Sequence, residues 1–159
     1  MTNTAIAAIT TASVVCTGLA GGVYLAFSAI VMPALRTHPA KDAIATMQRI
    51  NVSAIRPPFM IVFFGGAVTS GALAIMELAS GTLNVQSIAR IAGAVLALSS
   101  FGITVLRNVP LNNALAAMSS GGTDSQAAWT RFDGPWSTAN LIRGIAAVAA
   151  TTLLAVSLA

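Results

Sequence analysis

The stretch that decides the fold is MTNTAIAAITTASVVCTGLAGGVYLAFSAIVMPAL, residues 1–35, which contains no Asp, Glu, Lys or Arg. A helix needs about 20 apolar residues to cross the hydrocarbon core of a bilayer. We therefore predict a membrane-spanning helix over residues 5–33. Signal peptides that are cleaved normally begin with basic residues, and none is present here, so we expect the helix to be retained. Gly18 and Gly22 form a small-xxx-small pair that favours close packing against another helix.

Three more apolar stretches predict helices over residues 57–79, 86–107 and 136–158. The Pro57-Pro58 pair suits a first helical turn, where a missing N–H removes no hydrogen bond. We expect Glu77 to be an interface residue and Arg90 to snorkel to the headgroups along its apolar stem. The predicted fold class is all-α, a four-transmembrane-helix bundle forming a single integral membrane domain over residues 1–159.

The composition agrees with lipid as the main surroundings of the chain. Apolar residues make up 56% of the 159 residues and charged residues only 8%, whereas a soluble domain carries roughly a quarter charged residues. The net charge of +4 comes without a basic tract, which argues against nucleic-acid binding. One cysteine and one histidine give neither an internal disulfide nor the spacing of a metal cluster.

Basic residues resist transfer across the inner membrane during insertion, so their distribution predicts orientation. Seven lie in or beside the connections at 34–56 and 108–134, against Arg90 alone on the other side. Both termini are therefore expected outside, with the two long loops cytoplasmic. Each loop has a short amphipathic helical stretch, and Met47–Asn51 is expected to lie on the membrane surface. The seven residues are Arg36, Lys41, Arg49, Arg56, Arg107, Arg131 and Arg143.

A stripe of polar and aromatic side chains approaches the last span with helical spacing of four, three, four and three. Its members are Trp129, Asp133, Trp136, Asn140 and Arg143. Gly134-Pro135 predicts a helix start there, with Asp133 or Gly134 as its cap. Arg143 would then lie roughly 10 Å inside the helix, where a cation needs a partner or a wet cavity. The stripe predicts a polar pocket open to the cytoplasm; the alternative is an interfacial belt that fixes helix depth.

Several other polar residues have both a structural and a functional interpretation. Pro110 is expected to stop or bend the third span, and the neighbouring amides of Asn108 and Asn112 can cap freed backbone groups or bind a ligand. Asn51 is a helix-end residue or a further ligand-binding amide. His38 is either solvated or a proton acceptor near neutral pH. Cys16 lies roughly 33 Å from it along a helix, too far to share a metal.

Four motifs together resemble the anthrone oxygenase family of four-helix integral membrane proteins. They are Met32-Pro33-Ala34-Leu35, Met47 to Asn51, Asn108 to Asn112, and Trp129-x2-Phe132-x2-Pro135-Trp136-x3-Asn140-x2-Arg143. The resemblance implies a membrane-bound enzyme that oxidises a flat lipophilic substrate, anthrone- or hydroquinone-like, with O2 as co-substrate and without an established organic cofactor. Haem or a quinone stays open, although haem would have only His38 as a histidine ligand.

The resemblance and the residue pattern together suggest roles for the singled-out residues. Arg143 and Asn140 would stabilise a developing oxyanion, and His38 would be the candidate base. The predicted substrate-binding residues are Trp129, Trp136, Asn108, Asn112 and Asn51.

Two alternatives come from other functional classes. The chain could be a membrane binding or transport module for a small lipophilic molecule, or a scaffold subunit for a partner protein. Ion-coupled transport normally places an ionisable group near the midplane, and the predicted spans put none clearly there. Product formation separates the enzyme from both alternatives. Homo-oligomer formation is left open.

Overall fold

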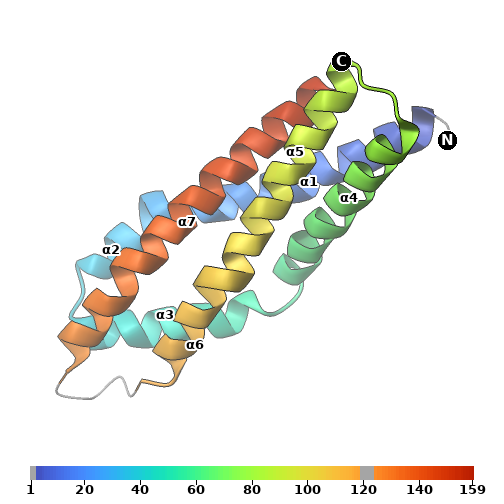
Figure 1. Cartoon of the computed structure of the whole chain (residues 1–159). Helices are drawn as coiled ribbons and strands as arrows, with labels where there is room; N and C mark the ends of the chain where they lie inside the picture. Colours follow the sequence, from blue (N-terminus) through green and yellow to red (C-terminus); the bar gives the residue numbers. More distant parts are fainter. Residues whose placement is uncertain (1–2, 119–123) are drawn as a thin grey trace.

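The computed structural model describes residues 3–118 and 124–159 as helices and short connections. Its long helices lie side by side as an elongated bundle (Figure 1). Four helical stretches are long and apolar enough to cross a membrane: Thr4–Arg36, Phe59–Ser80, Val85–Ala116 and Ser125–Val156. The predicted all-α, four-span bundle is thereby confirmed, and the chain is an integral membrane protein.

The bundle is built around its last helix. Helix α7 (Ser125–Val156) packs against α1 (Asn3–Ala26) and α5 (Val85–Ile103), and α4 (Phe59–Ser80) closes the ring by packing against the same two helices. Both termini and the α4–α5 connection lie at one end of the bundle, whereas α3 (Ala40–Ala54) lies across the other (Figure 1). We refer to these as the terminal end and the α3 end.

The first and third spans continue past the residues where we expected them to end. A π-helical segment, η1 (Phe27–Val31), joins α1 to α2 (Met32–Arg36), and η2 (Thr104–Asn108) joins α5 to α6 (Val109–Ala116). Each π segment is followed by a proline, Pro33 or Pro110, at the second position of the next helix. A proline clashes with the carbonyl four residues before it, and the wider π turn relieves that clash while the helix continues.

The predicted start of the fourth span near Pro135 was also wrong. Helix α7 begins at Ser125 and contains Pro135 in its interior. Asp133 is not a cap, because its carboxylate accepts two hydrogen bonds from Arg36, with Nε to Oδ2 at 2.7 Å and Nη2 to Oδ1 at 2.8 Å. A helix of 32 residues is about 48 Å long, well beyond the roughly 30 Å of hydrocarbon. The predicted loop at 108–134 is therefore largely helix.

Helix α3 confirms the predicted amphipathic segment but uses its apolar face differently. Ala43, Ile44 and Met47 are buried in a cluster with residues of α7 and α6, so this face packs on protein instead of lying on lipid. Gln48 donates hydrogen bonds to the Leu115 and Met118 carbonyls, at 2.8 and 3.0 Å. Helix α3 thereby caps the C-terminal end of α6.

Close helix packing involves a different glycine pair from the predicted one. A Cβ added at Gly18 would lie 3.3 Å from the Thr151 side chain, and one at Gly21 would lie 3.1 Å from Ala147. At Gly22 the added Cβ would meet nothing within 4 Å among the described residues. The two glycines of α1 that pack closely against α7 are therefore Gly18 and Gly21, which are three residues apart.

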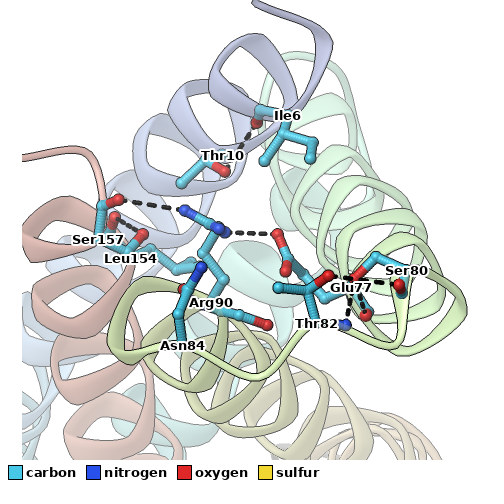
Figure 2. Close-up of polar contacts among 10 residues, drawn as sticks. Ile6, Thr10, Glu77, Ser80, Thr82, Asn84, Arg90, Leu154 and Ser157 are labelled. Carbon is cyan, nitrogen blue, oxygen red and sulfur yellow. Dashed lines mark hydrogen bonds and ion pairs between the residues drawn. The ribbon is translucent and has the colours of Figure 1, made fainter. Parts of the chain in front are cut away.

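At the terminal end, Glu77 and Arg90 form an ion pair between α4 and α5 (Figure 2). The Glu77 side chain is 3% exposed and that of Arg90 15%. Arg90 also donates to the Ser157 carbonyl at 3.3 Å. The expected snorkelling of Arg90 was therefore wrong, since its charge is neutralised inside the protein. Pro57-Pro58, joined by a cis peptide bond, precedes α4 and does not form its first turn.

Candidate functional site

The guanidinium of Arg143 lies inside the bundle, where groups from three helices hold it. Its Nη2 and Nε donate to Asn140 Oδ1 at 2.8 and 3.2 Å, and its Nη1 donates to Thr104 Oγ1 at 3.0 Å. Its Cζ lies 4.1 Å from the centre of the Tyr24 ring and 5.6 Å from that of Trp136. Arg143 is 7% exposed. Arg143 and Asn140, which the sequence places on one helical face, are thus hydrogen-bonded to each other.

The charge of Arg143 is not neutralised by a carboxylate. The ion pairs found within residues 3–118 and 124–159 are Arg36 with Asp133 and Arg90 with Glu77. Neutral oxygens and two aromatic faces surround Arg143 instead, and a cation over an aromatic ring gains about 0.5–2 kcal/mol. A buried charge without a counterion is expensive in a bilayer. The site is therefore electrostatically suited to an anionic ligand.

Asn140 is fixed in the orientation that presents its oxygen to Arg143. Its Nδ2 donates to the Tyr24 carbonyl and to Ser28 Oγ, both at 2.8 Å. Ser28 belongs to η1, and the carbonyl of Tyr24 lies just before that π segment. Asn140 is fully buried. The π turn of the first span therefore supports the group that orients Arg143.

A second set of contacts orients Trp136. Its Nε1 donates to Asn112 Oδ1 at 2.8 Å, and its backbone carbonyl accepts from Asn108 Nδ2 at 3.3 Å. The Phe27 ring packs on the indole with ring centres 5.6 Å apart. The side-chain amides of Asn108 and Asn112, for which both capping and ligand binding were open, therefore both contact Trp136. Asn108 Oδ1 has no hydrogen-bond partner among the described residues.

Some of these residues line a cleft of about 350 Å³, which falls within the size range of small-molecule sites. Arg143 and Thr104 provide its polar part, and the rings of Tyr24 and Trp136 contribute to its walls. Asn51 also lines the cleft, and its buried Nδ2 has no partner among the described residues. The remaining lining residues are Val23, Phe27, Ile50, Ala54, Ile55, Phe59, Met60, Val109 and Asn112.

Two predicted site residues lie elsewhere. His38 is exposed in the connection between α2 and α3, and it lines a separate hollow of about 400 Å³ with the Arg36–Asp133 pair. Trp129 is buried in the cluster beneath α3 and also lines that hollow. The structure therefore brings together Arg143, Asn140, Trp136, Asn112, Asn108 and Asn51, and leaves His38 and Trp129 apart.

Three residues that contact the predicted site were missed in the sequence. They are Tyr24, Ser28 and Thr104, which come from the first and third spans. A signal for Tyr24 exists, because Thr10, Ser13, Thr17 and Tyr24 recur at steps of three, four and seven residues on one face of an apolar helix. This spacing places the four polar side chains in a line along one face of α1, and the line ends at the site.

Within residues 3–118 and 124–159, no three His, Cys, Asp or Glu side chains are grouped so that they could hold a metal ion.

Comparison with known proteins gives one match. The sequence profile of the anthrone oxygenase family matches residues 59–153. That range includes α4, α5, η2, α6 and most of α7, and hence Thr104, Asn112, Trp136, Asn140 and Arg143. No curated protein and no solved structure matches the chain. Because the matched region covers more than half of the sequence, this chain belongs to the anthrone oxygenase family.

Proposed function

We propose that the chain is a membrane oxygenase that oxidises a flat, lipophilic anthrone- or hydroquinone-like molecule with O2 in the cleft beside Arg143. The observation that carries the proposal is the buried guanidinium without a carboxylate partner among the described residues, at the edge of an aromatic cleft. A ligand that becomes an oxyanion supplies the missing counter-charge. The family match supports the same reaction class.

The chemistry follows from the acidity of the substrate. An anthrone that loses a proton from its central methylene becomes an enolate, which is electron-rich enough to reduce O2 directly. Over the whole reaction the methylene carbon loses two hydrogens and gains one oxygen, and the other oxygen atom leaves as water. Arg143 would stabilise the enolate oxygen, because a preorganised cation in a dry site acts more strongly than one in water.

The other polar groups suit the opposite edge of such a substrate. Asn51 has a free buried amide N–H group, and Asn112 retains an NH2 group because its oxygen is used by Trp136. Either can donate to a substrate carbonyl or phenol oxygen. Tyr24, Phe27 and Trp136 would hold the flat rings. No histidine or carboxylate is among the residues that line the cleft in the described structure, so the proposed proton acceptor is water at its mouth.

The cleft is placed to receive its substrate from lipid. Val23 and Ile55, which line it, are 38% and 69% exposed. Both are apolar, and Val23 lies within the first candidate span. A tricyclic substrate dissolved in the bilayer would enter between α1 and the C-terminal end of α3.

We also propose an orientation with both termini outside and the α3 end in the cytoplasm. Six basic residues lie in the α3-end elements and connections, and the polar part of the cleft then lies toward the cytoplasmic half of the bundle. They are Arg36, Lys41, Arg49, Arg56, Arg107 and Arg131.

The test is anthrone-dependent O2 uptake, with anthraquinone formation, by protein purified in nanodiscs. Arg143→Gln should lower the rate by about 100-fold or more, the usual effect of removing an oxyanion-stabilising group. Thermal stability should change little, because the hydrogen bonds of Arg143 are lost together with the cost of burying a charge that has no counterion. Arg107→Gln is the matched control, since Arg107 is an exposed arginine on η2. Equal rates for Arg143→Gln and wild type would exclude Arg143 from the mechanism, and binding of anthrone without product would favour the transport or scaffold alternatives.

A further inference from the structure

A second, much smaller cavity lies between the helices. Its volume is about 20 Å³, and its walls come from α1, α4, α5 and α7. Since one water-sized molecule needs about 10–15 Å³ by this measure, the cavity has room for one small molecule. Its walls are mostly apolar, with Ala20, Phe63, Ala97 and Ala147 among the buried residues.

The cavity adjoins the substrate cleft. Tyr24 lines both, and no other described residue does. Thr104 of the cleft donates a hydrogen bond to the Ser100 carbonyl at 3.1 Å, and Ser100 lines the cavity. The outer wall contains Cys16, Val62 and Ala67, which are only half-buried between α1 and α4. The cavity therefore lies between the lipid-facing surface and the ring of Tyr24, over which the Arg143 guanidinium lies.

The polar side chains of the cavity wall are the three hydroxyls of Thr17, Tyr24 and Ser100. A buried water typically makes two to four hydrogen bonds. Ser100 Oγ donates to the Arg143 carbonyl at 2.9 Å. Thr17 Oγ1 is buried without a partner among the described residues, which leaves it as the one free hydroxyl there. The other wall residues are apolar and suit a small nonpolar molecule, whereas the hydroxyls make an ordered water the competing occupant, which the experiment below has to exclude.

We propose that this cavity is a binding site for dioxygen, which it takes from the bilayer and delivers past Tyr24 to the substrate cleft. The inference rests on the proposed oxygenase function. Dioxygen is small and nonpolar, and it is more soluble in hydrocarbon than in water. The binding is non-covalent, so Tyr24 and Arg143 keep the contacts described above.

Gly66 allows the cavity to be filled without disturbing the backbone. A Cβ at Gly66 would lie 3.5 Å from Cys16 Cβ and 3.6 Å from Thr17 Oγ1, which are ordinary van der Waals distances. Gly71 lies on the same helix, and a Cβ there meets nothing within 4 Å among the described residues. Gly66→Ala and Gly71→Ala therefore gain the same helix propensity and differ in whether they fill the cavity.

In steady-state kinetics at fixed anthrone, Gly66→Ala should raise the KM for O2 roughly fivefold, as expected when one methyl group displaces a small bound molecule. The kcat at saturating O2 and the affinity for anthraquinone should not change, and Gly71→Ala should match wild type. An unchanged KM for O2 in Gly66→Ala overturns the proposal. Thr17→Val replaces the free hydroxyl with a methyl group of similar size and should leave the KM for O2 unchanged. A lower KM in Thr17→Val would show that an ordered water occupies the cavity in the wild type, and it would also overturn the proposal.

A measurement without turnover separates this inference from the proposed function. Under O2 pressure, paramagnetic relaxation of labelled alanine methyl groups should be faster at Ala97 and Ala147 than at Ala94, which is buried outside the cavity. The difference should disappear in Gly66→Ala and persist in Gly71→Ala. If wild type shows this pattern but oxidises no anthrone, the oxygenase proposal fails and the gas site stands. Equal relaxation at the three alanines overturns the gas site.

Discussion

At the scale of single residues, the unpaired charge of Arg143 is the feature that a substitution can test most directly. Thr104 accepts a hydrogen bond from Arg143 Nη1 at 3.0 Å and is 8% exposed. Aspartate is close to threonine in size, so Thr104→Asp would place a carboxylate at the guanidinium. The protein then has its own counter-charge where we propose that the substrate oxyanion binds.

Thr104→Asp should therefore lower affinity for an enolate-forming anthrone about tenfold or more, equivalent to about 1.4 kcal/mol, while the melting temperature in nanodiscs is kept or raised. Thr104→Val, which removes the acceptor but adds no charge, serves as the control and should weaken binding less. Tryptophan fluorescence titration measures the affinity. Undiminished affinity in Thr104→Asp would argue against an anionic ligand at Arg143.

His38 provides a second prediction at this scale. The sequence makes it a natural base, but its side chain is exposed at a hollow lined by Arg36, Trp129 and Asp133 instead of the cleft. His38→Gln should thus change anthrone oxidation by less than about twofold, a difference of under 0.5 kcal/mol. Oxygen uptake at several pH values measures this. A large loss that external imidazole restores would return His38 to the mechanism.

The sequence predicted the part of the site that a single helix determines. Trp136, Asn140 and Arg143 follow helical spacing, and they do gather on one side of α7. Trp129 shares that spacing, but it lies beneath α3, seven residues before Trp136 and roughly 10 Å from it along the axis of α7. Tyr24 and Thr104 could not be assigned to the site in this way, because their contacts with Arg143 depend on how α1 and α5 pack against α7.

At the scale of helices, the two π segments explain how prolines and site residues occur together. Each π turn lies just before a proline and contributes contacts to the site: Ser28 from η1 and Thr104 and Asn108 from η2. Sequence patterns treat an internal proline as a helix end, which is why the first and third spans were predicted too short. The inserted turn keeps the helix continuous and changes which side chains face the bundle.

The Glu77–Arg90 pair makes a prediction about the α4–α5 hairpin. Because Glu77 is buried, Glu77→Gln leaves Arg90 without a counterion and should lower the free energy of unfolding by about 3–5 kcal/mol. The double variant Glu77→Leu, Arg90→Leu removes both charges and should unfold much closer to wild type. Thermal unfolding in the same detergent compares them. If the single and double variants are equally destabilised, the pair acts through packing and not through its charges.

At the scale of the whole molecule, the sequence was sufficient to predict a four-helix membrane bundle and an amphipathic helix at α3, but not how the helices pack at the α3 end. There the extended α6 and α7 pack with α3 around a cluster that includes Met47, Leu115, Trp129 and Phe132. Hydropathy identifies the part of a helix that lies in lipid and gives no signal for a further part that packs on protein. The cluster at this end gives the cleft a rigid boundary made by α3.

The orientation of the whole bundle can be tested with cysteines at its two ends. Thr82 is exposed in the α4–α5 connection and Thr46 is exposed on α3, and a Cys16→Ala background removes the native thiol. If the basic α3 end is cytoplasmic, a membrane-impermeant maleimide should label Thr82→Cys in intact cells and Thr46→Cys only after permeabilisation. The reverse pattern would place the α3 end outside and require the polar part of the cleft to face the exterior, whereas labelling of both in intact cells would indicate mixed insertion.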